Sequence, residues 1–448
     1  MNIPIFVTML FALQLFYWFV GKRSSKNSNV KEDYFLAGKS VAFFPLMMTF
    51  LATQVGGGVV LGAADEAFRV GWPVLLYPLG AALGLIILGA GIGRKLAGFQ
   101  VSTVAQILEV VYGSPMLRKV ASALSVISLF MILVAQIIAS HKFLVSLGLT
   151  NTPLFIAFWA IVIIYTAQGG LKAVISTDLV QAAFFSIVFF IGFALVYFTE
   201  PAVAAIQMPN LESFTQVSSK LTGWLLMPLL FMVIEQDMGQ RCFAGVSPKV
   251  VSRASLWAGI VTMAVCIVPV FFGTLAQKMN LTVPAGGSVL MAAIIQTTNP
   301  WVSALVGCAV LAAIISTATS LINALSSNIS GDFFAQVKSI KVVQASTALV
   351  SIGAIFFAFY FDNIVDLLIQ TYELSVSCLF VPIFIALFKR NGKYKAALLS
   401  IVFGAAGFCL FRVYPLPIPR EICSIVLSLI GFGLGELLAT KEVRATAQ

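Results

Sequence analysis

The sequence predicts an all-α polytopic membrane protein, and two observations carry this prediction. Of the 448 residues, 60% are hydrophobic and only 10% are charged, which leaves too little polar surface to cover soluble domains of that size. Apolar runs long enough to cross a bilayer as helices, roughly 20 residues each, recur along the whole chain. These features exclude a cytosolic enzyme, a nucleic-acid binder and a sensor kinase with a soluble module. We therefore attribute the net charge of +10 to the orientation of the chain in the membrane, not to a nucleic-acid-binding surface.

Clusters of Lys, Arg, Gly and Pro divide the apolar runs into about 13 predicted transmembrane spans. The first span lacks the basic start and the cleavage pattern of a signal peptide, so we expect a retained helix. The predicted spans are 4–20, 41–66, 72–93, 119–147, 152–168, 176–198, 222–241, 255–277, 302–329, 342–361, 364–388, 395–414 and 421–440.

The basic residues predict the orientation of these spans. Most of the 27 Lys and Arg residues fall in alternate loops, and loops rich in Lys and Arg stay in the cytoplasm. We therefore expect the N-terminus outside and the C-terminus in the cytoplasm, in the plasma (inner) membrane. The expected surroundings are a lipid bilayer, with no nucleic acid and no obligatory protein partner.

Two predicted spans are interrupted by residues that disfavour a helix. Gly56, Gly57 and Gly58 follow one another in the second span, and the seventh contains Pro228 before a polar Glu-Gln-Asp cluster. The two breaks lie five helices apart, which is the spacing of two inverted five-helix repeats; alternatively, the glycines only allow close helix packing. The repeat interpretation divides the chain into an N-terminal helix and loop (1–40), a first repeat (41–200), a second repeat (201–390) and two C-terminal helices with a short tail (391–448).

The break in the second span predicts a cation site. Unwound backbone inside a membrane needs polar partners, and the carbonyls of Ala52 and Val55 offer two oxygens to a hard cation. The ninth span places the Ala313 carbonyl and the Ser316 and Thr317 hydroxyls on one face. Together these groups would form a neutral five-oxygen cage suited to Na+. In the alternative interpretation, the hydroxyls bond their own helix or a neighbouring one.

A second cation site is a further hypothesis. Asp178 opens the sixth predicted span, where it is either a helix N-cap or a carboxylate facing Thr319 and Ser320. In the seventh span, Glu235 is expected to reach the central cavity, and Asp237 to pair with Arg241 one helical turn later.

Four segments in order resemble the sodium:solute symporter family, and the resemblance covers nearly the whole chain. DYFLAGKS (33–40) is similar to the family's entry into its first core helix, and YTAQGGLKAVISTDLVQ (165–181) to its loop between core helices four and five. EQDMGQRCFAGVSPKVVSRA (235–254) is similar to the inner end of core helix six, and AAIISTATSLINALSS (312–327) to core helix eight.

This resemblance implies a five-plus-five inverted-repeat (LeuT-like) core, preceded by one helix and followed by two. It implies that the conserved sodium site falls on Ala52, Val55, Ala313, Ser316 and Thr317. Some members have a second sodium site, and its positions fall on Asp178, Thr319 and Ser320.

The solute is less constrained by the resemblance. The first core helix looks like that of the choline-transporter branch, but Gln54 and Glu235 stand where that branch has tryptophans, so an aromatic cage around a quaternary ammonium is not expected. The expected solute contacts are Gln54, Gly56, Gly57, Gly58, Gln136, Glu235 and Gln236. We therefore expect a symporter, not an enzyme, that imports a small polar organic solute with Na+ by alternating access. The alternatives are a proton-coupled carrier on the same fold, using Asp178 or Glu235, and a channel or non-transporting sensor.

Overall fold

The helices of this chain are long, apolar and packed into one bundle. A computed structural model describes residues 2–24, 31–206, 211–334, 339–414 and 416–446. Within these ranges, ten helices are long and apolar enough to cross a membrane, or twelve if each of two bent helix pairs counts as one span. An isolated β-bridge joins Val41 to Gly245. The predicted all-α polytopic membrane protein is confirmed.

Several helices begin at a side chain that caps them. Asn299, for example, accepts hydrogen bonds from the N–H groups of Trp301 and Val302, and Pro300 opens the helix that follows. The helices are α1 (Ile3–Ser24), α2 (Lys31–Leu36), α3 (Phe43–Gln54), α4 (Ala63–Val70), α5 (Leu76–Ile87), α6 (Gly93–Ala97), α7 (Val104–Tyr112), α8 (Pro115–Ser146), α9 (Thr152–Thr199), α10 (Leu211–Thr215), α11 (Ser218–Ile234), α12 (Gln236–Ala244), α13 (Pro248–Lys278), α14 (Val289–Thr297), α15 (Pro300–Asn328), α16 (Ile340–Phe357), α17 (Ile364–Ser375), α18 (Val381–Ala386), α19 (Tyr394–Val413) and α20 (Arg420–Thr446).

The fifth and sixth predicted spans lie on either side of a break in one long helix. The predicted spans 152–168 and 176–198 both lie in α9, which is interrupted at Gly170. Gly170 has φ 65° and ψ 179°, a conformation that other residues rarely adopt. The part of α9 after the break is one of the spans counted above, and the part before it, residues 152–168, is not among them.

Both predicted helix breaks are present. α3 ends at Gln54, a π-helical turn over Gly58–Gly62 leads into α4, and the two parts are bent by 52°. α11 and α12 are bent by 45°, with Glu235 between them in an extended conformation. Pro228 lies inside α11 and is not the break. The second interruption is therefore at the polar cluster, several residues after the proline.

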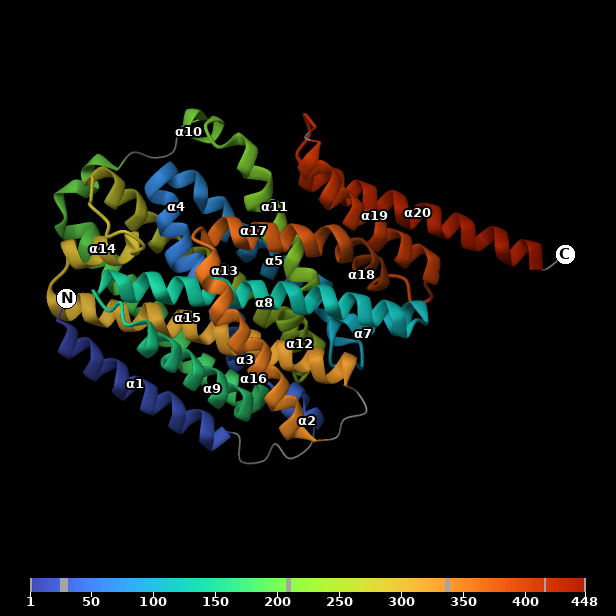
Figure 1. Cartoon of the computed structure of the whole chain (residues 1–448), viewed down its shortest axis with the longest axis horizontal. Helices are drawn as coiled ribbons and strands as arrows, with labels where there is room; N and C mark the ends of the chain where they lie inside the picture. Colours follow the sequence, from blue (N-terminus) through green and yellow to red (C-terminus); the bar gives the residue numbers. More distant parts are fainter. Residues whose placement is uncertain (1, 25–30, 207–210, 335–338, 415, 447–448) are drawn as a thin grey trace.

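One helix forms the centre of the bundle. In the span that contains α15, 94% of the most apolar stretch is buried, against 11% for α1, 33% for α19 and 28% for α20. Figure 1 shows α1 at one edge of the molecule and α19 and α20 together at another, with α8 and α15 passing through the middle. The exposed side chains of Phe11, Phe19 and Leu437 suit these outer helices to a lipid environment. Between them lies the core that positions the site.

Candidate functional site

The break after α3 brings backbone oxygens against two hydroxyls of α15. The Ser316 hydroxyl donates to the carbonyl oxygens of Ala52 (3.0 Å) and Ala313 (2.9 Å). The Thr317 hydroxyl lies 3.1 Å from the carbonyl oxygens of Ala52 and Thr53. Four of the five residues expected to bind sodium therefore meet in one cluster.

The fifth residue, Val55, caps the C-terminus of α3. It is fully buried, and its ψ of 73° takes the chain out of the helix. The groups that meet in this cluster are neutral carbonyl and hydroxyl oxygens, a donor set that fits a hard cation of low charge. Because Ser316 and Thr317 are also buried, a cation here would be held away from water and would tie α3 to α15.

A small central cavity adjoins this cluster. Its volume is about 20 Å³, which is room for about one water molecule. Both helix breaks contribute to its wall. The polar groups and glycines that line it are Thr53, Gln54, Gly56, Gly58, Tyr77, Gln136, Glu235, Asp237, Thr317 and Tyr372.

The two broken helices are linked across this cavity. The Gln54 amide nitrogen donates to the Glu235 carboxylate over 3.3 Å. The Gln136 side chain, from α8, accepts a 2.6 Å hydrogen bond from the Gly57 N–H, so its carbonyl oxygen stabilises the unwound backbone. Sequence reasoning expected Gln54, Gly56, Gly57, Gly58, Gln136 and Glu235 near one another, and the structure places them so.

Gln236 does not join this group. Its amide oxygen accepts from the Val104 N–H at 2.7 Å, and its amide nitrogen donates to the Ser102 carbonyl at 3.2 Å. These two bonds hold α12 against the start of α7. The expected solute contact of Gln236 is thus replaced by a packing role, because a buried amide takes the nearest unpaired backbone groups.

Asp178 lies within α9 and is fully buried, so the expected role as a helix N-cap is wrong. Its carboxylate accepts from the Thr49 hydroxyl at 2.5 Å and pairs with the Arg241 guanidinium at 3.3 Å. Arg241 also donates to the Ser320 hydroxyl at 2.5 Å and to the backbone carbonyl of Asp237 at 2.9 Å. Arg241 was expected to pair with the side chain of Asp237, and it pairs with Asp178 instead. Asp178 lies too far away in the sequence for helical periodicity to predict this contact.

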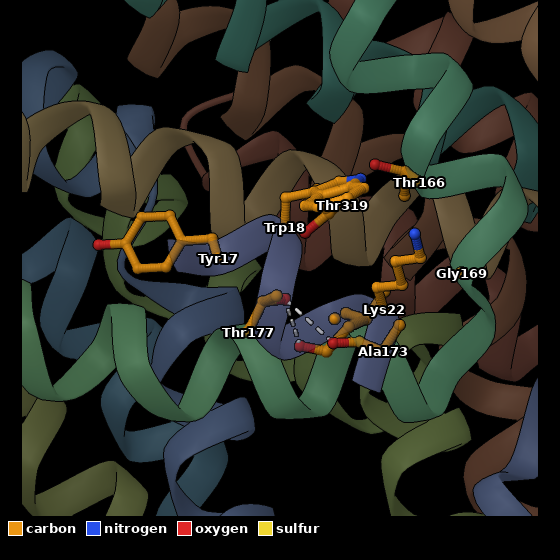
Figure 2. Close-up of a pocket in the computed structure, with 10 residues that line it drawn as sticks. Tyr17, Trp18, Lys22, Thr166, Gly169, Ala173, Thr177 and Thr319 are labelled. Carbon is orange, nitrogen blue, oxygen red and sulfur yellow. Dashed lines mark hydrogen bonds between the residues drawn. The ribbon is translucent and has the colours of Figure 1, made fainter. Parts of the chain in front are cut away.

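Thr319 is directed away from the central cavity. Its hydroxyl donates to the Ser316 carbonyl at 3.0 Å, and its side chain lines a separate cavity of about 280 Å³ between α1, α9 and α15. Figure 2 shows this cavity with Trp18, Lys22 and Thr177 around it. Of the three residues expected at a second sodium site, the structure joins Asp178 and Ser320 (3.4 Å) through a cluster that contains Arg241.

Ion pairs cross both ends of the bundle. At the end predicted to be outside, Lys142 pairs with Asp65 (2.9 Å) and Lys220 with Glu66 (2.8 Å). These pairs join α4 to α8 and to α11, the helices around the cavity.

At the opposite end, Arg118 at the start of α8 pairs with Asp332 (2.8 Å) and Glu109 (2.7 Å). Arg118 thus fastens α8 to α7 and to the end of the central helix. Sequence reasoning missed this group and the two tyrosines of the cavity, Tyr77 and Tyr372. Tyr77 and Tyr372 lie inside predicted apolar spans, where a polar group is a signal of function, whereas Arg118, Glu109 and Asp332 lie outside the predicted spans.

Helices broken at mid-span around a buried oxygen cluster are typical of secondary transporters, and similarity to solved structures identifies the fold. The chain superposes on a substrate-bound Na+-coupled sialic acid symporter with a TM-score of 0.76, 17% identity and coverage of 97% of this chain and 98% of that one. It superposes on Mhp1, a nucleobase-cation-symport-1 family transporter, with a TM-score of 0.64, 15% identity and coverage of 93% and 96%. The fold is LeuT-like, as predicted.

The family follows from the sequence. The model of the Sodium:solute symporter family matches residues 34–404, and the chain belongs to this family. The sodium/glucose cotransporter 2 of Rattus norvegicus is 26% identical over 260 residues, which are 49% of this chain and 38% of that relative. The chain thus matches less than half of the relative's length. Membership in a transporter family confirms that the chain is not an enzyme.

Proposed function

We propose that the chain is a sodium-coupled symporter that imports a small polar organic solute by alternating access. The observation that carries this proposal is the oxygen cluster of Ala52, Ala313, Ser316 and Thr317 at the break of α3. Family membership and the LeuT-like fold support it. Val55 completes the proposed set of ligands.

Sodium would act by joining two helices. Its proposed ligands come from α3 and α15, which belong to different predicted repeats, so a bound ion would resist their separation. Solute would bind beside Gln54, Gly56 and Gly58, next to the same break. Since both ligands would stabilise the same helix arrangement, each would raise the affinity of the other by the same factor.

Transport requires the central cavity to open to each side in turn. Its present volume of about 20 Å³ is too small for an organic solute, and ion pairs join helices at both ends of the bundle. Opening one end at a time would expose sodium and solute first outside and then in the cytoplasm. The distribution of Lys and Arg supports an N-terminus outside and a cytoplasmic C-terminus in the plasma (inner) membrane.

The test is the response of the purified protein to sodium. In potassium buffer, added sodium should raise the thermal unfolding midpoint, because a ligand that binds only the native state stabilises it. The double substitution Ser316→Ala, Thr317→Ala removes two of the proposed ligands and should abolish this rise.

Thr262→Ala is the matched control, since this buried hydroxyl bonds the Ala258 carbonyl of its own helix, α13. The control should retain the sodium response. A response that survives the double substitution would overturn the assigned site, and stabilisation by acid pH without sodium would support proton coupling instead.

A further inference from the structure

Two carboxylates of the central cavity form no ion pair with any described residue. Glu235 and Asp237 both line the cavity, and their exposed fractions are 4% and 0%. Among the described residues, the ion pairs within 4.0 Å include neither of them. Burying carboxyl groups without a basic partner is costly, which makes this pair a candidate binding site.

Helix capping does not account for these side chains. Glu235 occupies the N-cap position of α12 but makes no side-chain capping bond; its carboxylate reaches across the cavity to Gln54. Asp237 uses one oxygen, Oδ1, to accept from the Met238 N–H at 2.8 Å. Its second oxygen, Oδ2, is buried and receives no N–H or O–H from the described part of the chain; the carboxyl group next to Asp237 is that of Glu235.

The nearby guanidinium does not neutralise the pair. Arg241 is directed to Asp178, Thr49 and Ser320, and it meets Asp237 only at the backbone carbonyl. Asp178 therefore takes the ion pair of this buried guanidinium. Glu235 and Asp237 remain next to each other in the cavity wall, without an ion pair to any basic side chain among the described residues.

We propose that the transported solute carries a primary or secondary ammonium group, which binds between the carboxylates of Glu235 and Asp237. This inference rests on the proposed symport function and specifies its solute. An ammonium with N–H groups supplies both the missing positive charge and the donor that Asp237 Oδ2 lacks.

Other cations fit this position less well. A quaternary ammonium has no N–H to donate and is recognised mainly by aromatic faces, whereas the lining aromatics Tyr77 and Tyr372 bring hydroxyl groups. Sodium has its own proposed site, the neutral oxygen cluster at Ala52 and Thr317.

The experiment compares amines with neutral molecules of similar shape. The purified full-length protein in saturating sodium is screened by thermal unfolding with ethanolamine, putrescine and glucosamine. The counterparts are ethylene glycol, 1,4-butanediol and glucose, with choline as the quaternary case. At least one amine should raise the midpoint while its neutral counterpart and choline do not.

Glu235→Gln and Asp237→Asn should each raise the apparent Kd of that amine by at least about 10-fold, because each removes a charge-assisted bond. The exposed Asp362→Asn should leave it unchanged. All three variants should keep the sodium response, which also shows that they fold. Loss of the sodium response in wild type, with the amine response intact, would contradict sodium coupling and not the amine site.

Four outcomes would overturn the amine proposal. In the first, none of the amines raises the unfolding midpoint; in the second, a neutral counterpart or choline raises it as much as the amine does. In the third, the amine still raises the midpoint of both substituted variants. In the fourth, a neutral solute binds, and its binding requires acid pH. The last would assign the pair to proton coupling.

Discussion

The Asp178 carboxylate lies 3.3 Å from the Arg241 guanidinium, and neither side chain is exposed. The pair joins α9 to α12, and the hydroxyls of Thr49 and Ser320 add α3 and α15 to the same cluster. One buried ion pair therefore connects four helices, including both that carry the proposed sodium ligands.

Breaking this pair should destabilise the protein strongly. Arg241→Gln leaves the Asp178 charge buried without a partner, a loss of about 3–5 kcal/mol of unfolding free energy. Adding Asp178→Asn should recover part of that loss, since the uncompensated charge is gone. Denaturant unfolding in detergent measures both. The exposed Arg253→Gln in α13 serves as control, and an Arg241→Gln variant as stable as this control would contradict the prediction.

A single sodium ion should bind. The Arg241 guanidinium supplies a positive charge beside Asp178, and Thr319 is directed to another cavity, so the second predicted sodium site lacks both its free charge and one hydroxyl. Sodium titration of the unfolding midpoint should fit one site. A fit that requires two ions, with one lost in Asp178→Asn, would restore the second site.

Gly56→Ala should weaken sodium binding. A methyl group at this position would lie 2.5 Å from the Thr317 hydroxyl oxygen and 2.7 Å from the Gln136 amide oxygen, closer than real contacts allow. Displacing Thr317 moves a proposed sodium ligand, so we expect the apparent sodium Kd to rise by about 10-fold or more, equivalent to about 1.4 kcal/mol. Gly433→Ala in α20 meets no atom within 4 Å and should match wild type. Unchanged sodium affinity in Gly56→Ala would argue against the site.

The Glu66–Lys220 pair should hold one end of the cavity closed. Glu66 is 3% exposed and joins α4 to α11, so Glu66→Gln removes the charge from that contact. Hydrogen exchange followed by mass spectrometry should then show faster exchange in residues 63–70, because local opening becomes easier. Glu109→Gln, which weakens the Arg118 cluster at the other end, should leave exchange in 63–70 unchanged. Equal acceleration by both variants would contradict separate closure of the two ends.

The sequence by itself determined the membrane class, the positions of both broken helices and the oxygen cluster. These depend on local composition: apolar runs set the spans, consecutive glycines unwind one helix, and Ala313, Ser316 and Thr317 share a face through helical periodicity. The carbonyl of Ala52 was proposed as their partner because the glycines unwind the helix beside it, and the family resemblance assigned the conserved sodium site to the same residue.

Only the tertiary structure decided which partner each buried polar side chain takes. Arg241 was expected to bond Asp237 one turn away, yet it pairs with Asp178, 63 positions earlier in the chain. Gln236 was expected in the cavity, yet it bonds Ser102 and Val104. A buried polar group must be satisfied by whatever the packed helices bring within reach. That choice depends on helix packing across the whole bundle, which the local pattern of residues does not contain.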